Sequence, residues 1–458
     1  MPDSTTGLPA EAAEFLARHP DTVALDAILA DLSGIVRGKR YPVAEMGKIL
    51  QSGFAIPGSV FMLDTQGESN DPDGLGFSDG DPDCLVKVIP GSLKPVPWAE
   101  RPLAQVMVTL ESETGEPYYY EPRNVLARVL ERFSDLGLRP VVAFELEFYL
   151  LDRERHPNGA PKPPRSPVTG RRDSSTQVYG MSTLDAFAGM LDDMSQACTA
   201  QGVPSGAITA EYAAGQFEIN LHHIENPLKA ADDCVLFKRI VKGVARKHGF
   251  QASFMAKPYV ERAGSGLHMH VSLLDQAGNN VFDGGAQPAS DTLRHAIGGT
   301  LAQLPEAMAF LAPNVNSYRR FVPDIFVPTQ RSWGFENRSV ALRVPGGKGA
   351  ARRIEHRVAG ADANPYLALA TLLSGIHQGI TGKIDPGEAW VGNASASYDE
   401  TLPFRPRRAL EKLVPDCGLA GYLGADYVRA YRACKEKELE RFEAQISPLE
   451  YSWFLQAD

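Results

Sequence analysis

The chain has 458 residues, a length that allows two or three ordinary domains or one large domain with a smaller one. Its 43% hydrophobic and 22% charged residues are proportions that suit a globular protein. Its 46 basic and 56 acidic residues give a formal charge of −10, which argues against a general nucleic-acid binder, because such proteins carry a basic excess that neutralises phosphates. No apolar run approaches the roughly 20 residues of a membrane-spanning helix, so we expect no membrane role.

The cysteines favour a reducing compartment. They are few, odd in number and scattered, and none forms a C-x-x-C pair: Cys84, Cys198, Cys234, Cys417 and Cys434. We therefore expect no disulfide framework and a cytoplasmic location. The opening Met1–Gly7 segment has no basic start and no apolar stretch after it, so we also expect no secretory signal.

Short strands and loops are expected over the first hundred residues. Thr22–Asp31 is apolar, and Leu32–Lys39 contains Gly34 and Gly38, a pattern that predicts a hairpin. A long acidic, Gly-rich connection follows over 64–83. Loops of that length are uncommon in compact proteins and often have a function.

Helical periodicity begins at Pro122. Apolar residues recur at helical spacing over Asn124–Phe133, directly after a proline that suits the first turn of a helix. Further helices are predicted over 184–200, 231–247, 365–380 and 426–445, and Asn364 supplies a cap for the third of these. Strands lie between the helices, so this larger part of the chain is expected to be α+β.

Four strand-like segments share a pattern in which apolar residues alternate with Glu, His, Asn or Arg. They are Phe144–Phe148, Phe217–Leu221, Leu267–Val271 and Ile354–Val358. Because side chains alternate at period two, each segment projects its polar pair to one face. The simpler alternative is that each strand shows a solvated acidic face, which is plausible for one strand but much less so for all four.

If the four strands are neighbours, five carboxylates and one imidazole meet in one cavity. These residues are Glu145, Glu147, Glu211, Glu218, Glu355 and His268. Clustered carboxylates repel one another unless they are protonated or bridged by cations. Oxygen-rich ligands with one imidazole suit magnesium or manganese better than zinc, so we expect one of those ions.

Arginines and glycines surround the same segments. Arg320, Arg338, Arg343 and Arg357 are of a type that binds carboxylates and phosphates in a bidentate manner, which suggests an anionic substrate bridged to cations. Surface salt bridging is the alternative, and it suits Arg319, Arg352 and Arg353 best. The glycines of Ala263–Leu267 would let the backbone approach a ligand closely.

Several of these segments together resemble the sequence blocks of the glutamine synthetase family, in the family's order. The blocks are Lys257–Ser272, Asn316–Arg320, Asn337–Ser339, Arg353–Glu355, Asn364–Tyr366 and the closing Ser447–Ser452. The resemblance implies an α+β fold, with a small N-terminal β-grasp domain over 20–112 and a catalytic domain over 118–458 that has an antiparallel active-site sheet flanked by helices. It also implies six-membered homo-oligomeric rings with active sites at subunit boundaries, and leaves open whether two rings stack into a dodecamer.

The resemblance further assigns roles to individual residues. It implies one divalent ion held by Glu147, Glu211 and Glu218, and a second held by Glu145, His268 and Glu355. It implies glutamate contacts from Gly264, Arg320 and Arg357, ATP contacts from His270, Ser272 and Arg343, and an action of Arg338 and Arg357 on the γ-carboxylate and the transferring phosphoryl group. The implied reaction passes through γ-glutamyl phosphate, which an amine then attacks.

The departures from the family pattern concern the amine. Where ammonia-using members carry an aspartate in a Phe-Asp-Gly-Ser-Ser motif, this chain reads Ile56–Val60, and Phe326 stands where those members have a glutamate. An apolar pocket would disfavour bare ammonium and favour an amine with hydrocarbon attached. We therefore expect a bulky aromatic or apolar monoamine, in a pocket formed by Pro57, Tyr179, Phe326 and Trp333, although a core role for Trp333 is equally compatible with the sequence.

Three alternatives remain. A polyamine ligase would need an acid for a second ammonium, and Asp324, Glu336 or the Gly80–Asp83 loop could supply it. A true glutamine synthetase is disfavoured by the missing acids, and a non-catalytic ring scaffold by the complete set of metal ligands. The base that deprotonates the amine stays open among Tyr179, Asp324 and solvent, and so does modification of Tyr398.

Overall fold

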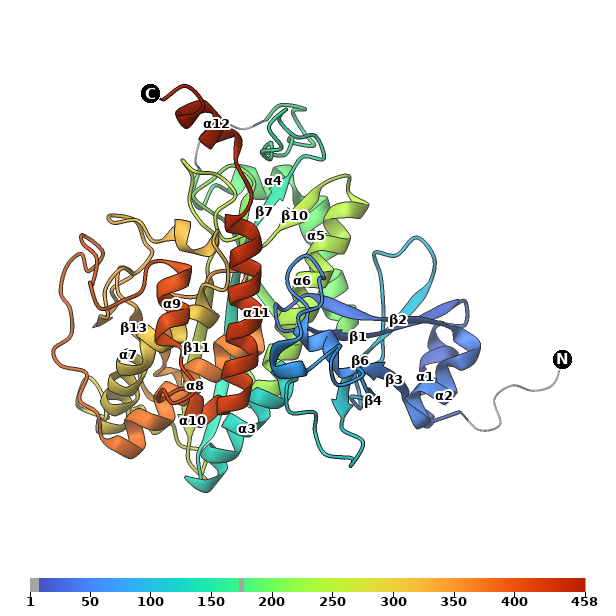
Figure 1. Ribbon diagram of the computed structural model, residues 1–458, viewed down its shortest axis with the longest axis horizontal. Coiled ribbons are helices and arrows are strands. Elements are labelled where there is room, and N and C mark those ends of the chain that lie inside the picture. Colours follow the sequence, from blue (N-terminus) through green and yellow to red (C-terminus); the bar gives the residue numbers. More distant parts are fainter. Residues whose placement is uncertain (1–7, 173–176, 458) are drawn as a thin grey trace.

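The computed structural model describes residues 8–172 and 177–457, so the Met1–Gly7 segment considered above lies outside the described residues. The strands form two separate sheets, a smaller one in the N-terminal part and a larger one in the rest of the chain (Figure 1). No helix in these two ranges is both long enough and apolar enough to cross a membrane.

The N-terminal sheet has six strands in the order β2-β1-β6-β4-β3, with β5 also paired to β6. The strands are β1 (Ala24–Ala30), β2 (Val36–Pro42), β3 (Phe54–Pro57), β4 (Asp83–Val88), β5 (Lys94–Pro95) and β6 (Leu103–Glu111). Two helices, α1 (Ala10–Arg18) and α2 (Met46–Ser52), pack on it. The predicted hairpin is confirmed as the antiparallel pair β1–β2, and a Cβ at Gly38 would lie only 2.0 Å from the Ala27 carbonyl oxygen.

The long acidic connection between β3 and β4 lies against helix α11 (Ala425–Glu443). Asp64 forms an ion pair with Arg441 at 2.9 Å, and Asp73 forms one with Arg429 of the same helix at 2.5 Å. The connection holds only short 3-10 turns, Gly58–Met62 and Pro72–Gly74. It is therefore fastened by charge to the catalytic part of the chain rather than by regular structure of its own.

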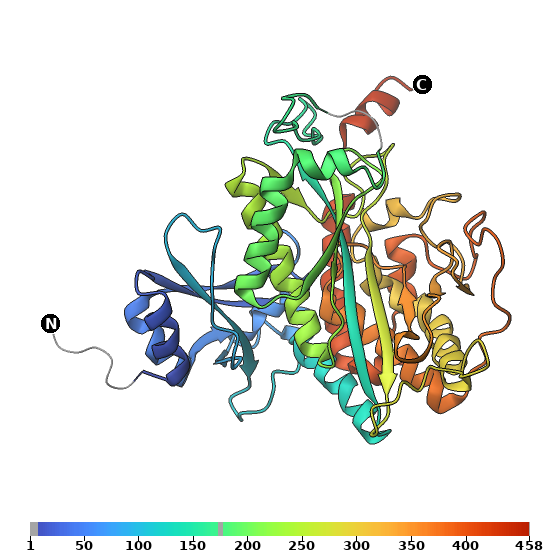
Figure 2. The same ribbon diagram turned by 180° about the vertical axis from the view of Figure 1, so that it is seen from behind.

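The larger sheet has eight strands in the order β12-β13-β14-β11-β7-β9-β8, with β10 also paired to β7. The strands are β7 (Arg139–Leu151), β8 (Ser205–Ala210), β9 (Gln216–Leu221), β10 (Gln251–Ser253), β11 (Leu267–Leu274), β12 (Trp333–Phe335), β13 (Leu342–Val344) and β14 (Ile354–His356). Every pair is antiparallel except β12–β13, and the long strands β7 and β11 run side by side in Figure 2.

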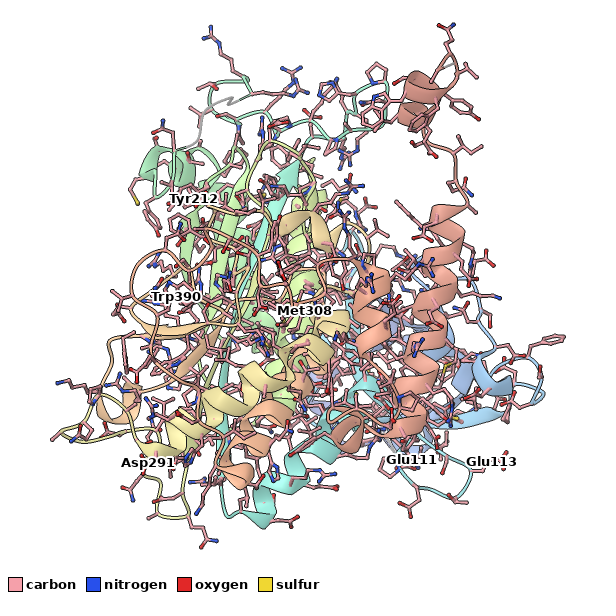
Figure 3. All side chains as sticks on the ribbon, turned by 60° about the vertical axis from the view of Figure 1, so that its left-hand side comes forward. Glu111, Glu113, Tyr212, Asp291, Met308 and Trp390 are labelled. Atoms are coloured by element: carbon pink, nitrogen blue, oxygen red, sulfur yellow. The ribbon has the colours of Figure 1, made fainter. Side chains whose placement is uncertain are left out.

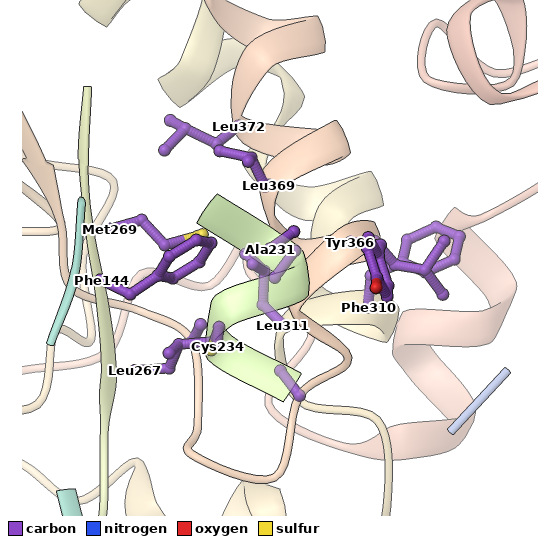
Figure 4. Close-up of a cluster of buried hydrophobic side chains, with 14 of the residues drawn as sticks. Phe144, Ala231, Cys234, Leu267, Met269, Phe310, Leu311, Tyr366, Leu369 and Leu372 are labelled. Carbon is purple, nitrogen blue, oxygen red and sulfur yellow. The ribbon is translucent and has the colours of Figure 1, made fainter. Parts of the chain in front are cut away.

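Helices cover the apolar face of this sheet directly or pack behind those that do, except the last helix, which has no buried residue. They are α3 (Pro122–Asp135), α4 (Met181–Ala186), α5 (Ala188–Gln201), α6 (Pro227–Lys247), α7 (Asp291–Leu311), α8 (Pro365–Gly382), α9 (Pro406–Lys412), α10 (Ala420–Leu423), α11 and α12 (Pro448–Phe454). Figure 4 shows the contact: Phe144 and Met269 from the strands lie beside Ala231 and Cys234 of α6 and Leu369 of α8. The apolar members of each alternating strand thus form the core, and the polar members point the other way.

Four of the five predicted helices lie close to their observed positions as α3, α6, α8 and α11, and the fifth is divided in two. Helices α1, α2, α7, α9, α10 and α12 were not predicted, so the expectation of short strands and loops over the first hundred residues was incomplete. The stretch 184–200 is divided into α4 and α5 at Phe187, and α6 begins four residues before the predicted start. Helix α7 was not predicted, because it contains Pro305 and is apolar around most of its circumference. Its Met308 lies within the packed side chains in Figure 3, while Asp291 lies at its exposed end.

Glycines explain why α7 lies so close to α8. A Cβ at Gly299 would lie 2.2 Å from the Gly375 carbonyl oxygen and 2.3 Å from the Gly379 nitrogen, so only glycine fits at this crossing. This requirement is tertiary, since nothing local to either helix demands glycine there.

Asn364 joins the N-terminal part to the catalytic part. Its Oδ1 accepts from the Tyr366 backbone nitrogen at 3.0 Å and so caps α8, while its Nδ2 donates to the carbonyl oxygens of Asp31 at 2.9 Å and Leu32 at 3.3 Å. The side chain is buried. One amide therefore satisfies a helix end and two carbonyl groups of the N-terminal part.

Replacing Asn364 by Ala is expected to lower the free energy of unfolding by about 2–4 kcal/mol, because it removes a cap and both bonds of the buried amide nitrogen, and leaves the Leu32 carbonyl without a donor while Asp31 keeps its bond from the Gly34 nitrogen. The matched control is Asn226→Ala, which removes the exposed cap of α6 and its 3.1 Å bond from the Lys229 nitrogen, with an expected loss of about 1 kcal/mol. Urea unfolding followed by circular dichroism measures both, and equal losses would contradict the linking role of Asn364.

Candidate active site on the catalytic sheet

The four strands with alternating polar residues are neighbours in the order β14-β11-β7-β9. In their register His268 is opposite Glu145, Glu147 is opposite Glu218, and His270 is opposite Glu355. The polar side chains therefore gather on one face of the sheet. This is the arrangement that the sequence required for a shared cavity.

Two groups of these side chains have the geometry of metal sites. The donor atoms of Glu145, His268 and Glu355 all lie within 4.8 Å of one another, and so do those of Glu147, Glu218 and His268. The groups share His268, and each extends across three adjacent strands. Carboxylate oxygens with one imidazole suit magnesium or manganese.

Electrostatics supports a cation at these groups. Burial and the charge of Glu147 raise the pKa of Glu218 to about 9, and the same two causes raise the pKa of Glu211 to about 7. Both shifts mean that ionised carboxylates are unfavourable here without a counter-charge. A divalent ion would supply that charge, so the donor set fits one.

Glu145 and Glu355 are held ionised by their neighbours. Burial opposes ionisation of Glu145, but hydrogen bonds from His268 and His270 keep its pKa well below the usual range. Burial likewise acts against Glu355, yet Arg357 and His268 hold its pKa at about 2. The Nδ1 of His270 accepts from Arg353 Nε at 3.0 Å, which directs its Nε2 toward Glu145 Oε1 at 2.9 Å.

The ligand sets implied by the family resemblance can be compared with this geometry. Glu145, His268 and Glu355 are brought together as one group. The other group consists of Glu147, Glu218 and His268. Glu211, which directly follows β8, is not a member of it, although the charge of Glu147 raises its pKa. Placement of Glu211 as a ligand therefore remains a prediction.

Two guanidinium groups donate hydrogen bonds to Glu355, one to each carboxylate oxygen. Arg343 Nη1 donates to Oε2 at 2.7 Å, and Arg357 Nη1 donates to Oε1. Arg357 Nε also donates to the Arg338 carbonyl oxygen at 3.1 Å, so the segment containing Arg338 is fixed to the same cluster. These arginines place positive charge beside the carboxylates, where an anionic substrate would enter.

The glycine-rich segment lies directly on Arg320. A Cβ at Gly264 would lie 2.7 Å from Arg320 Cγ, and one at Gly266 would lie 3.3 Å from Arg320 Nη2. The Gly266 nitrogen donates to Glu147 Oε2 at 2.9 Å. Arg320 is buried, with Nη1 donating to the Val358 carbonyl oxygen at 3.0 Å and Nε left without a partner. A buried cation with a free donor beside this loop suits the carboxylate of a substrate.

A cavity of about 310 Å³ opens beside β7 and β11. It is lined by Glu145, His270 and Ser272 together with three residues without a predicted role here: His222, His223 and Arg353. It thus contains two of the three residues expected to contact ATP, and the third, Arg343, lies nearby on Glu355. The adjacent His222 and His223 directly after β9 were the available signal, but a histidine pair alone does not indicate a ligand site.

The residues expected to form the amine pocket are not all together. Phe326 is 56% exposed, and its ring centroid lies 5.8 Å from that of Tyr212, a residue the sequence analysis missed. Tyr179 is also exposed, and its hydroxyl accepts from Arg338 Nη1 at 3.0 Å. The sequence feature that could have identified Tyr212 as a site residue is its position directly after Glu211.

Trp333 and Pro57 lie elsewhere. Trp333 is buried, donates through its indole nitrogen to the Gly387 carbonyl oxygen at 3.2 Å and packs against Phe335, so its core role is correct and its placement in the pocket is wrong. Pro57 ends β3 and is opposite Asp83, in the N-terminal sheet. It belongs to a different sheet from the carboxylate cluster.

Comparison with known proteins places this site in context. A family model described as the catalytic domain of glutamine synthetase matches residues 119–454. The chain is 43% identical over 445 residues to gamma-glutamylputrescine synthetase PuuA of Escherichia coli (strain K12), covering 97% of this chain and 94% of that protein. It is 35% identical over 390 residues to a glutamate–isopropylamine ligase of Pseudomonas sp, covering 83% of each.

Other similarities extend the same pattern. The chain is 32% identical over 436 residues to gamma-glutamylethanolamide synthetase GlnA4 of Streptomyces coelicolor, covering 94% of this chain and 91% of that protein. Its fold is similar to the solved structure of a GmaS/ADP complex, with a TM-score of 0.83, 27% identity and coverage of 97% and 99%. The likeness covers both sheets, which confirms the expected fold.

Replacing Glu218 by Gln is expected to abolish high-affinity magnesium binding and to make the metal-free protein less sensitive to high pH. The folded pKa of about 9 lies above the unfolded value near 4.5, so the folded state holds the extra proton and stability falls as pH rises between those values. Metal titration and thermal unfolding of metal-free protein from pH 5 to 9 measure both effects.

The control for this substitution is Glu225→Gln, which removes an exposed carboxylate on the same sheet's periphery that pairs with Arg139 at 3.1 Å. It should leave magnesium binding and the pH profile unchanged. Wild-type magnesium affinity in Glu218→Gln would show that this carboxylate is not a ligand.

Proposed function

The chain belongs to the glutamine synthetase family and is an ATP-dependent γ-glutamyl ligase, and we propose that it joins glutamate to one amino group of an aliphatic diamine of putrescine's size. The observation that supports this substrate is the 43% identity to a gamma-glutamylputrescine synthetase over 97% of the chain. The relatives named for isopropylamine and ethanolamide support an organic amine in general. This reverses the order expected from sequence, which put aromatic or apolar monoamines first.

The site residues support a two-stage reaction. Arg320 is suited to hold the α-carboxylate of glutamate, and Arg338 and Arg357 are suited to the γ-carboxylate and to the phosphoryl group that reaches it from ATP. The carboxylate and imidazole groups described above would hold magnesium or manganese, which when bound neutralises the charge of the phosphates. The amine then displaces phosphate from γ-glutamyl phosphate.

The position of the amine follows from the exposed aromatic side chains. Phe326 and Tyr212 form an apolar surface next to Glu211, and it suits the methylene groups of an alkyl amine. Bare ammonium gains nothing from such a surface and loses its hydration, so ammonia use is disfavoured. An aromatic monoamine is the second candidate, because it would stack on the same rings.

Asp324 is the most suitable acid for the second ammonium of a diamine. It lies two residues before Phe326, and its Oδ1 accepts only a neutral donor among the described residues, Asn393 Nδ2 at 2.9 Å. Glu336 is instead paired with Arg343 at 3.3 Å. Asp81 and Asp83 of the other candidate loop lie in the N-terminal part, with Asp83 opposite Pro57, so they would reach an amine pocket only from an adjacent subunit.

The N-terminal sheet fits a role in a neighbouring site. Pro57 and the segment after it lie on a different sheet from the carboxylates of the same chain. In a six-membered ring of the kind expected for this family, that segment would complete the amine pocket of the adjacent subunit. The molecular mass measured by light scattering tests this proposal and distinguishes one ring from two.

An amine panel tests the proposed substrate. Phosphate release with glutamate, ATP and magnesium should give the highest kcat/KM with putrescine, lower values with benzylamine and isopropylamine, and the lowest with ammonium. The highest value with ammonium would refute the apolar pocket. Absence of turnover with every amine, together with absence of metal binding, would establish the non-catalytic scaffold instead.

Replacing Asp324 by Asn should raise the KM for putrescine about tenfold and leave kcat/KM for butylamine unchanged, because butylamine has the same carbon chain without the second ammonium. The tenfold effect corresponds to about 1.4 kcal/mol, within the range of one charge-assisted hydrogen bond. Asp416→Asn, at an exposed position on the helical side, is the control. Equal effects on both amines would show that Asp324 does not bind the second ammonium.

A further inference from the structure

A cleft of about 1800 Å³ lies between the N-terminal sheet and helix α6, away from the carboxylate cluster. One wall comes from β1, β2 and the Val96–Arg101 segment, and the other from α6, β10 and Phe254. Nine of its lining residues are Lys or Arg, whereas two are Asp or Glu. A basic cleft of this size is unexpected in a chain of net charge −10.

The basic character is concentrated on one stripe of α6. Lys238, Lys242 and Arg246 follow one another at intervals of four residues, so their side chains share a helix face. Like charges at that spacing destabilise a helix unless a counter-charge is present. The stripe belongs to a helix on the apolar side of the catalytic sheet, whereas the carboxylate cluster lies on its polar side.

Asp362 lines the same cleft and its charge acts on Lys238, but no described carboxylate pairs with Lys242 or Arg246. Lys238 is buried, and its ammonium donates to the Ala363 carbonyl oxygen at 2.9 Å. Within residues 8–172 and 177–457, the side chains of Lys242 and Arg246 form no hydrogen bond or ion pair, and the Lys242 ammonium lies 5.8 Å from the ring of Phe254. Burial and the charge of Lys242 lower the pKa of Lys238 to about 8.

Other cations of the cleft are already paired. Arg40 and Arg239 share Asp26, at 2.6 and 2.7 Å, and Lys247 pairs with Asp193 at 3.0 Å. The stripe differs from these pairs: Lys238 is its buried member, whereas Lys242 and Arg246 are exposed residues that line the cleft. The charges of Lys242 and Arg246 are therefore available to an anionic ligand that enters the cleft.

We propose that this cleft binds a small molecule carrying two or more carboxylate or phosphate groups, held by Lys238, Lys242 and Arg246. Trp98 closes the opposite side, where it lies so near α6 that a Cβ at Gly243 would be 2.3 Å from the indole. A bound anion would join α6 to the Val96–Arg101 segment. It would thereby add a contact between the N-terminal part and the catalytic part to those already made by Asn364, by the Arg239–Asp26 pair and by the acidic connection on α11.

Calorimetric titration and thermal unfolding of the full chain in metal-free buffer test the proposal, with citrate as the carboxylate probe and tripolyphosphate as the phosphate probe. At least one probe should bind wild-type protein and raise its unfolding midpoint. The double variant Lys242→Gln/Arg246→Gln should weaken that binding at least tenfold, with turnover at the wild-type level. The probe that binds identifies the class of anionic group.

A second variant separates this cleft from the active site. Arg343→Gln alters the candidate ATP-binding cluster and should leave probe binding at the cleft unchanged. Binding lost in Arg343→Gln and kept in the double variant would place the anion at the active site and overturn the proposal. Absence of binding in the wild type, with a fall in oligomer mass in the double variant, would overturn it in favour of a second copy filling the cleft.

Discussion

Repulsion among carboxylates on one face of the catalytic sheet is the constraint on which the rest of this structure depends. Four adjacent strands place Glu145, Glu147, Glu218 and Glu355 in close proximity, and burial makes their charges more unfavourable still. Two arginines neutralise Glu355 within the chain, while no described residue forms an ion pair with Glu218. The unmatched negative charge is what makes this face a site for cations and for the anionic substrates that cations bridge.

The sheet can tolerate this face only because its other face is a well-packed core. Phe144, Leu267 and Met269 alternate with the polar residues along the same strands and pack against α6 and α8. The glycines at the α7–α8 crossing let a second layer of helices lie close behind. Burial of apolar surface thus offsets the unfavourable charge, and fixes the strand register that brings the carboxylates together.

The amine pocket and the basic cleft also present groups that lack a matching partner, but fewer of them than the carboxylate cluster does. At Phe326 and Tyr212 apolar rings are exposed where a ligand of matching chemistry would cover them. On α6, Lys242 and Arg246 form no ion pair with the described residues, and both line the cleft. In each place the chain presents an incomplete interaction, from which we infer the chemistry of the proposed ligand: metal ions and glutamate at the first site, an alkyl chain at the second, and a polyanion at the third.

Much of this could be predicted from sequence because it depends on local periodicity. The period-two alternation gave the polar and apolar faces of the four strands, the glycines gave the hairpin, and the family blocks gave the ligase chemistry. Helix α7 was missed, because burial on most sides removes the amphipathic pattern that identifies a helix. Trp333 was assigned to the amine pocket, although it is buried, because the sequence alone does not distinguish an aromatic residue of a core from one that lines a pocket.

The sequence by itself therefore determined which side chains share a strand face and which reaction they serve. Only the tertiary structure decided which strands are neighbours, that His268 belongs to both groups of donors, that Tyr212 meets Phe326, and that the basic stripe of α6 faces a cleft. The physical reason is that these relations join residues far apart in the chain, and their distances depend on packing between elements rather than on any local preference.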